Sequence, residues 1–258
     1  QLVHMIMGGE VYLGPQSTDD SWRIGRELGL QIAAHILSPF GMRPVFDGLA
    51  KAGHLGPDNL FIHMTGMSDM AWEKVRDAGA AVSLAVPIEM NMRHDMPPIL
   101  KTLSLGIQPS LSVDVECTLT ADMFTQMRST MSLQRAFVNE MALTGAADRP
   151  ALLTTRDVLR FATMEGARDL RLDRKVGSLT PGKEADIIIL DAEAINVAPL
   201  NVVPGAVVSL MERSNVETVI VAGKVRKWKG ELLDVDLSRL RSQLQASRHY
   251  IFVAAGVP

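Results

Sequence analysis

Short apolar runs alternate with amphipathic segments over the first half of the chain. The runs begin near Leu2, Gln31, Asn59, Ala81 and Gln108 and have the character of buried strands. They are separated by roughly 20 to 30 residues, about the length of one strand, one helix and two loops. The pattern therefore predicts successive βα units, in which each helix returns the chain to the start of the next parallel strand.

Capping residues and glycines mark the helices between these strands. N-cap residues occur at 17–20 and 68–69, and glycines that can end the helices follow at Gly29 and Gly79. A pair of prolines at 97–98 opens a further short helix. These signals predict a (β/α)8 TIM barrel, with a flavodoxin-like open sheet as the structural alternative. Because five strands cannot close an eight-stranded barrel, we expect an additional amino-terminal segment.

The carboxyl-terminal part of the chain has a different pattern. Helices are expected over 121–143 and 157–165, the second capped by Thr154 and Thr155. After Gly177, segments rich in β-branched residues predict strands. These strands are expected at 185–191, 206–211, 216–221, 224–228 and 231–233. The pattern predicts a small antiparallel β module, followed by an amphipathic helix over 237–253.

Three regions follow from these patterns, within the α/β class. Residues 1–175 are expected to form the later βα units of the TIM barrel. Residues 176–235 are expected to form part of a β-sandwich, and residues 236–258 a closing C-terminal helix.

The composition is that of a globular protein with a sizeable core. The chain has 258 residues, of which 47% are hydrophobic, and a formal net charge of −3. No basic patch with interleaved aromatic residues is present, so nucleic-acid binding has no support. No apolar stretch approaches the roughly 20 residues that span a bilayer, so we expect no membrane partner. The single cysteine, Cys117, indicates a cytoplasmic protein and is expected to be a small buried residue.

Three of the apolar runs end in a side chain that can bind metal or transfer a proton. His35 ends the run that begins at Gln31, His63 ends the next run, and Asp114 follows the strand that begins at Gln108. The carboxyl ends of barrel strands meet at one face, where active sites lie. A lone histidine at a strand end is more often a hydrogen-bonded structural residue. Two imidazoles and a carboxylate that converge, however, are ligand types that Zn²⁺ and Fe²⁺ favour, which predicts a metal-dependent enzyme.

A distinctive motif lies at the start of the β module. Residues 176–191 read Val-Gly-Ser-Leu-Thr-Pro-Gly-Lys-Glu-Ala-Asp-Ile-Ile-Ile-Leu-Asp. Together with the strand ends at His35, His63 and Asp114, this motif resembles the carboxyl-terminal part of an amidohydrolase-superfamily enzyme. The resemblance is to the branch that contains cytosine deaminases, S-adenosylhomocysteine deaminases and chlorohydrolases.

The resemblance implies a role for each strand-end residue. His35 would be a metal ligand, Asp114 a ligand that also moves a proton, and His63 a residue that faces the substrate. One divalent metal is implied, Zn²⁺ first and Fe²⁺ as the alternative, together with a small-molecule substrate and a homo-oligomer. The implied reaction is attack of metal-bound hydroxide on an amino-substituted heterocycle, which breaks a carbon–nitrogen bond other than a peptide bond. Hydrolysis of a cyclic amide or a chloro-heterocycle is the alternative reaction.

The chain departs from the superfamily pattern at three places. No two of the six histidines are two positions apart, so the usual His-x-His pair is absent. Ser38 stands three residues after His35, where deaminases of this branch carry a glutamate. Residues 86–95 replace the usual Asn-Pro-x-Ser-Asn stretch, and here Glu89 and His94 are candidates for substrate binding or proton transfer, with a solvated loop as the alternative. A catalytically inactive fragment or binding module is therefore the alternative to an enzyme.

Overall fold

Two β-sheets organise the protein. The computed structural model describes residues 3–9 and 11–257, so the predicted start of the first strand at Leu2 lies outside the described residues. The larger sheet is parallel, with the adjacent strands β1 (Ile6–Gly8), β2 (Gln31–Leu37), β3 (Asn59–Thr65), β4 (Ala81–Leu84) and β5 (Ser110–Leu111). Neighbouring strands are consecutive in the sequence, as in a (β/α)8 barrel, whereas a flavodoxin-like sheet has the order 2-1-3-4-5. Within the described residues the barrel is not closed.

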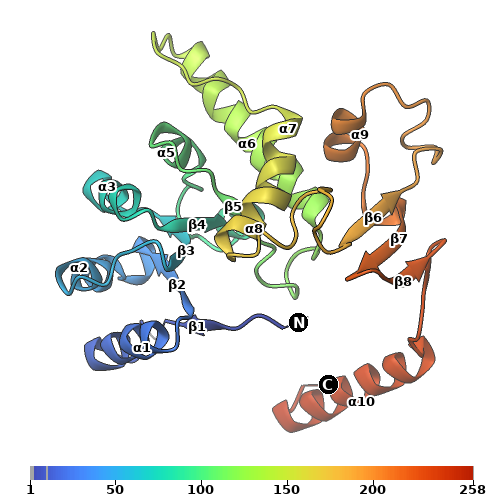
Figure 1. The fold of residues 1–258 in the computed structure, drawn as a ribbon, viewed down its shortest axis with the longest axis horizontal. Coiled ribbons are helices and arrows are strands. Elements are labelled where there is room, and N and C mark those ends of the chain that lie inside the picture. Colours follow the sequence, from blue (N-terminus) through green and yellow to red (C-terminus); the bar gives the residue numbers. More distant parts are fainter. Residues whose placement is uncertain (1–2, 10, 258) are drawn as a thin grey trace.

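Helices between the strands cover one face of the parallel sheet. In Figure 1, α1 (Pro15–Glu27), α2 (Arg43–Lys51) and α3 (Asp69–Ala78) lie on the same side of the strands. Phe46 of α2 packs edge-on against Phe61 of β3, with ring centroids 5.6 Å apart. Burial of one such large side chain contributes about 1.5–3 kcal/mol relative to exposure. The helices therefore anchor one face of the sheet, and the other face remains available for polar groups.

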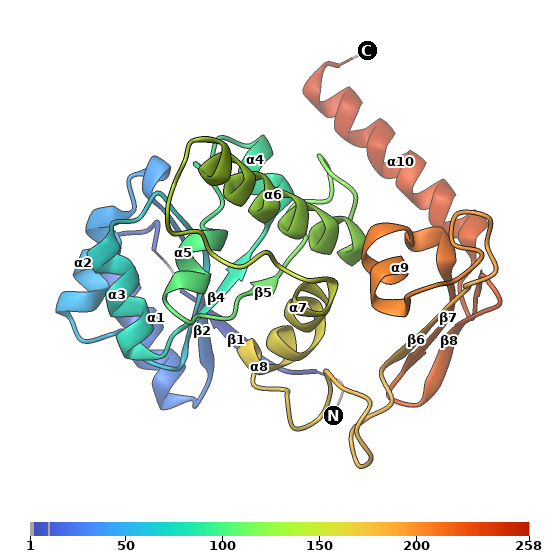
Figure 2. The same ribbon diagram turned by 90° about the horizontal axis from the view of Figure 1, so that it is seen from above.

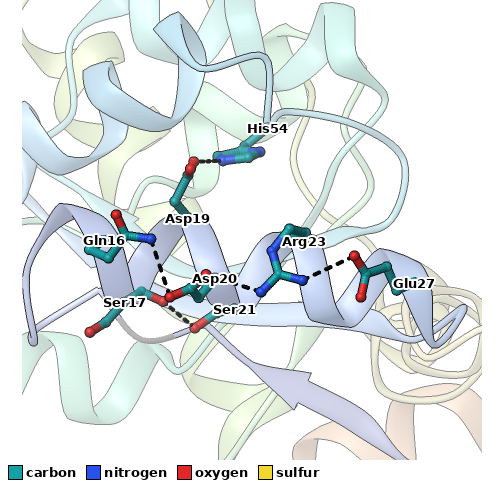
Figure 3. Close-up of polar contacts among 8 residues, drawn as sticks. All are labelled: Gln16, Ser17, Asp19, Asp20, Ser21, Arg23, Glu27 and His54. Carbon is teal, nitrogen blue, oxygen red and sulfur yellow. Dashed lines mark hydrogen bonds and ion pairs between the residues drawn. The ribbon is translucent and has the colours of Figure 1, made fainter.

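Helix α1 begins earlier than the sequence predicts. The expected N-caps at 17–20 lie inside the helix, which starts at Pro15, directly after Gly14 with φ 104°. Proline is favoured in a first turn because its missing N–H costs no hydrogen bond there. The hydroxyl groups of Thr18 and Ser21 instead donate to carbonyl oxygens one turn earlier, at 3.0 and 2.7 Å. Figure 3 shows the polar contacts that run along this helix.

The caps predicted for the next helices are confirmed. The N–H of Ala71 donates to Ser68 Oγ (3.3 Å) at the start of α3, and Gly79 ends that helix in the left-handed conformation, with φ 65°. A side chain at Gly79 would be strained by this φ, which is why glycine suits the position. The predicted proline pair directly precedes α5 (Ile99–Ser104).

Three helical segments follow the parallel sheet. They are α6 (Met123–Leu143), α7 (Thr155–Arg160) and, after a π-helical turn (Phe161–Glu165), α8 (Gly166–Asp169). Thr154 and Asp157 form a reciprocal capping box at the start of α7. The helix predicted over 157–165 is therefore α7 continued by the π-helical turn. In this turn the buried carboxylate of Glu165 accepts hydrogen bonds from Arg160 and Arg168 (both 2.5 Å).

The smaller sheet is antiparallel and confirms most of the predicted β module. Its adjacent strands are β6 (Ile187–Leu190), β7 (Val216–Val221), β8 (Lys224–Trp228) and β9 (Glu231–Leu232). The strand predicted at 206–211 is wrong, because this segment belongs to the helix α9 (Val203–Ser209). Pro204 lies in its first turn, and α9 packs against α6 and α7 with Ala206 and Val208 buried. Tertiary packing outweighs the β propensity of its valines.

The last helix is confirmed, but it does not close over the described part of the protein. Helix α10 (Leu237–Ala255) extends away from the smaller sheet, and none of its described residues is buried. Figure 2 shows this arrangement. No helix within residues 3–9 and 11–257 is long and apolar enough to cross a bilayer. The division of the chain at residues 175 and 235 stays a prediction.

Asp169 at the end of α8 makes the stability of this fold depend on pH. Its side chain is buried, and burial raises its pKa to about 7, although hydrogen bonds from Ser110 oppose this change. Between about pH 4 and 7 the native state thus holds a proton that the unfolded chain has released. We expect the free energy of unfolding to fall as the pH rises through this range, by at most about 4 kcal/mol.

Urea unfolding at pH 5 and pH 8 tests this prediction. Asp169→Asn should remove most of this pH dependence, whereas Asp77→Asn, at an exposed carboxylate, should keep it. An equal pH dependence in Asp169→Asn and the unchanged protein would contradict the assignment.

Candidate active site

Polar side chains from successive βα units meet at the carboxyl ends of the strands. They are His35 of β2, His63 of β3, Glu89 of α4 (Val86–Asn91), His94 in the loop after α4, and Asp114 in the loop after β5. In the sheet, His63 is paired with Ile36, the residue after His35. The rings of His35 and His63 are tilted, with centroids 5.6 Å apart.

His63 is the centre of this cluster. Its Nδ1 lies 3.0 Å from Glu89 Oε1 and its Nε2 lies 3.2 Å from Asp114 Oδ2. The side chains of His63 and Glu89 are 1% and 0% exposed, whereas that of Asp114 is 17% exposed. The imidazole thus links a fully buried carboxylate to one that reaches the open side of the cluster.

The two contacts of His63 differ in kind. Nδ1 is hydrogen-bonded to Glu89, whereas Nε2 lies within ion-pair distance of Asp114. An imidazole nitrogen and a carboxylate oxygen therefore lie side by side at the open side of the cluster, and these are groups that acid–base chemistry uses.

His94 forms the wall beside His63. Its ring packs edge-on against both His63 and Phe40, with centroid distances of 4.9 and 5.3 Å. Burial, and then the nearby His63, lower the pKa of His94, so the ring is neutral at pH 7. The pKa of His35 is lowered in the same way, an effect that Asp114 partly offsets. Neutral imidazoles are the form that binds metal.

The backbone of the site is held in an unusual conformation. His63 (φ 72°), Met64 (φ 55°) and Asp114 (φ 60°) all lie in the left-handed region. For residues other than glycine this costs about 1–2 kcal/mol each, and such strain concentrates at functional sites. At His63 and Met64 it coincides with a register shift between β2 and β3. The bulge directs His63 toward Glu89 and Asp114, where a regular strand would continue its alternation.

The structure brings the residues predicted from the sequence together. The solvated-loop alternative for Glu89 and His94 is wrong, since they are 1% and 6% exposed. Cys117, by contrast, is exposed and not buried as expected. Sequence reasoning missed Phe40, because a lone aromatic residue after a strand carries no chemical signal. It also missed the backbone N–H of Ala85, which donates to Glu89 Oε1 at 2.9 Å.

The site provides some of the ligands that a divalent metal needs. His35 and Asp114 provide an imidazole nitrogen and a carboxylate oxygen, which suit Zn²⁺ and Fe²⁺. Among the described residues, no group of three or more His, Cys, Asp or Glu side chains has an arrangement that could hold an ion. A catalytic zinc site uses three protein ligands, so the described residues supply two donors of such a set.

A parallel βα sheet with histidines and carboxylates gathered at its carboxyl edge is the arrangement of a barrel enzyme. The amidohydrolase family profile matches residues 32–226, and the chain belongs to this family. It is 30% identical over 193 residues to 5'-deoxyadenosine deaminase from Methanothermobacter thermautotrophicus, covering 74% of this chain and 42% of that protein. It is 26% identical over 243 residues to 5-methylthioadenosine/S-adenosylhomocysteine deaminase from Caldanaerobacter subterraneus, covering 90% and 54%. The chain thus spans about half the length of these relatives.

Solved structures confirm the TIM-barrel fold. Zinc-bound adenosine deaminase from Xanthomonas campestris has a TM-score of 0.83 and 22% identity, covering 93% of this chain and 55% of that one. Zinc-bound atrazine chlorohydrolase from Arthrobacter aurescens has a TM-score of 0.79 and 18% identity, covering 90% and 52%. At these identities the likeness shows the fold alone. The predicted family and fold class are both confirmed.

The edge-on packing of His94 predicts how two substitutions at this position change the free energy of unfolding. His94→Ala should lower the free energy of unfolding by about 1–3 kcal/mol, because it leaves a cavity between two rings. His94→Phe keeps an aromatic ring and no charge, so the loss should be smaller. Urea unfolding at pH 7 measures both changes. Equal losses in the two variants would show that ring packing is not what His94 contributes.

Proposed function

We propose that the protein is a metal-dependent hydrolase that removes ammonia from an amino-substituted heterocycle. The bond broken is a carbon–nitrogen bond other than a peptide bond, and the substrate is a small molecule. The observation that carries this proposal is the contact of His63 with both Glu89 and Asp114 at the carboxyl edge of the sheet. The relatives named as deaminases of 5'-deoxyadenosine and of 5-methylthioadenosine/S-adenosylhomocysteine support it.

In this proposal His35 and Asp114 are ligands of one divalent ion, Zn²⁺ or alternatively Fe²⁺. When bound, such an ion acts as a Lewis acid and makes water a better nucleophile near neutral pH. The zinc-bound neighbours support this choice of ion. The exposed position of His35 and the partial exposure of Asp114 leave both donors accessible from the open side of the cluster.

The chain's own residues would bind the substrate and move the proton. Asp114 accepts a proton from the attacking water at a carboxylate oxygen and delivers it to the leaving amine. His63 Nε2 lies beside that carboxylate and would accept a hydrogen bond from the hydroxyl group of the tetrahedral centre. His94 and Phe40 form an aromatic wall that limits the approach of water and orients a flat ring.

Ser38 bears on the alternative reactions, hydrolysis of a chloro-heterocycle or of a cyclic amide. Arg43 Nε donates to Ser38 Oγ, and Arg43 Nη2 donates to the carbonyl oxygen of Gly66 at 2.6 Å. A serine hydroxyl is a much weaker acid than a carboxyl group, so Ser38 cannot transfer a proton to a ring nitrogen as a carboxyl group does. Hydrolysis of a chloro-heterocycle or a cyclic amide is therefore the second candidate, and a non-catalytic binding module is the alternative to both.

An activity assay on Asp114 variants tests the proposal. Ammonia release from a panel of aminopurines, aminopyrimidines and aminotriazines should be measured, with chloride release from chlorotriazines in parallel. Asp114→Asn should lower kcat by about 10²–10⁴-fold, because it removes the proton acceptor. Asp77→Asn, at an exposed site, is the control and should leave kcat unchanged.

Three results distinguish the candidates. Ammonia release that depends on Asp114 supports the deaminase, and chloride release that depends on Asp114 supports the chlorohydrolase. Turnover that is unchanged in Asp114→Asn would overturn the catalytic assignment. No turnover of any tested substrate by the unchanged protein would favour the binding module.

A further inference from the structure

The buried carboxylate of Glu89 lies behind His63, away from the open side of the site. It extends from α4, and its side chain is 0% exposed. Its Oε1 has two partners, the backbone N–H of Ala85 at 2.9 Å and His63 Nδ1 at 3.0 Å. Its Oε2 has no hydrogen-bond partner among the described residues. Among the described residues, the side-chain hydrogen bonds of Glu89 thus converge on one oxygen.

An isolated buried carboxylate is costly, so its position requires an explanation. The N–H of Ala85 can only donate, and this bond fixes Oε1 at the junction of β4 and α4. Oε1 then presents an acceptor to the imidazole at a fixed point. A ring nitrogen that lies 3.0 Å from an acceptor oxygen is favoured as N–H, because it then donates a hydrogen bond to that oxygen.

The geometry points to Glu89 as a positioning residue that acts through His63. By holding the proton on Nδ1, Glu89 fixes the tautomer and the orientation of the ring and directs Nε2 to Asp114. Glu89 itself touches neither the substrate nor the attacking water. This inference rests on the proposed function only in that His63 Nε2 acts on the substrate; the control of the ring by Glu89 is a property of the protein alone.

Because the backbone of His63 is strained, its ring needs a hydrogen bond to fix its orientation. With φ 72°, the residue has left the regular alternation of β3, so strand geometry no longer sets the direction of its ring. His94 packs edge-on against the ring, and its own buried Nδ1 has no hydrogen-bond partner among the described residues. On its Nδ1 side, Glu89 is therefore the partner that decides which nitrogen carries the proton.

NMR of the protein labelled with ¹⁵N-histidine tests the proposal without any substrate. The nitrogen shifts report which ring nitrogen of His63 carries a proton. In the unchanged protein at pH 7, Nδ1 of His63 should be protonated. Glu89→Leu should remove this preference, and Glu89→Gln, which keeps an acceptor oxygen, should retain it. An unprotonated Nδ1, or a tautomer that is the same in Glu89→Leu, would overturn the proposal.

Kinetics then separates positioning from simple support of the fold. Glu89→Leu should lower kcat by about 10–100-fold with KM changed less than about threefold, the size of effect seen when a supporting partner is lost. Glu89→Gln should recover most of kcat. In a His63→Ala background, Glu89→Leu should lower kcat no further, because its effect passes through the imidazole.

Glu165→Gln is the matched control, since Glu165 is an equally buried carboxylate away from the site. It should lower stability and leave kcat unchanged. A full additional loss of kcat from Glu89→Leu in the His63→Ala background would overturn the positioning role. The NMR measurement needs no turnover, so it tests the role of Glu89 even if the proposed reaction is wrong. If Glu89→Leu does not fold, the spectrum of the unchanged protein still shows whether Nδ1 carries the proton.

Discussion

His63 lies between the carboxylates of Glu89 and Asp114, and this arrangement requires three strands of one parallel sheet to be in register. A displacement of about 1 Å of any strand would break one of the two contacts, because hydrogen bonds weaken steeply beyond their usual distance. The helices on the outer face supply the rigidity. Phe46 and Phe61, buried between α2 and β3, are examples of the packing that holds the strand ends in place.

The site contains backbone conformations and buried polar atoms that lower the stability of the fold. Two features oppose folding: left-handed conformations at His63 and Asp114, and polar atoms on Glu89 and His94 that have no partner among the described residues. Such features persist where the surrounding packing over-determines them. Similar features occur elsewhere, for example at Gln126 and Thr218, but in this cluster they coincide with histidines and carboxylates at the strand ends. The buried Glu165, by contrast, has both carboxylate oxygens hydrogen-bonded, one to Arg160 and the other to Arg168.

The spacing of apolar runs predicted the parallel strands and their order. Each strand, each helix and each glycine that ends a helix is recognised from residues that are neighbours in the sequence. It also predicted His35, His63 and Asp114, since a polar residue after a buried run is visible in sequence. The burial of Glu89 and the wall formed by Phe40 depend on contacts between loops, which no local pattern encodes. The helix α9 was predicted as a strand because its valines favour β structure, whereas packing against α6 and α7 decides its conformation.

Metal content tests the central claim, that the strand ends form a hydrolase centre, most directly. Elemental mass spectrometry on protein purified without chelator should find about one zinc or iron per chain, as a single catalytic site requires. His35→Ala should lose most of this metal, whereas His54→Ala should keep it, because His54 lies in the loop after α2 and contacts Asp19 of α1. No bound metal after reconstitution, or equal metal in the two variants, would contradict the account.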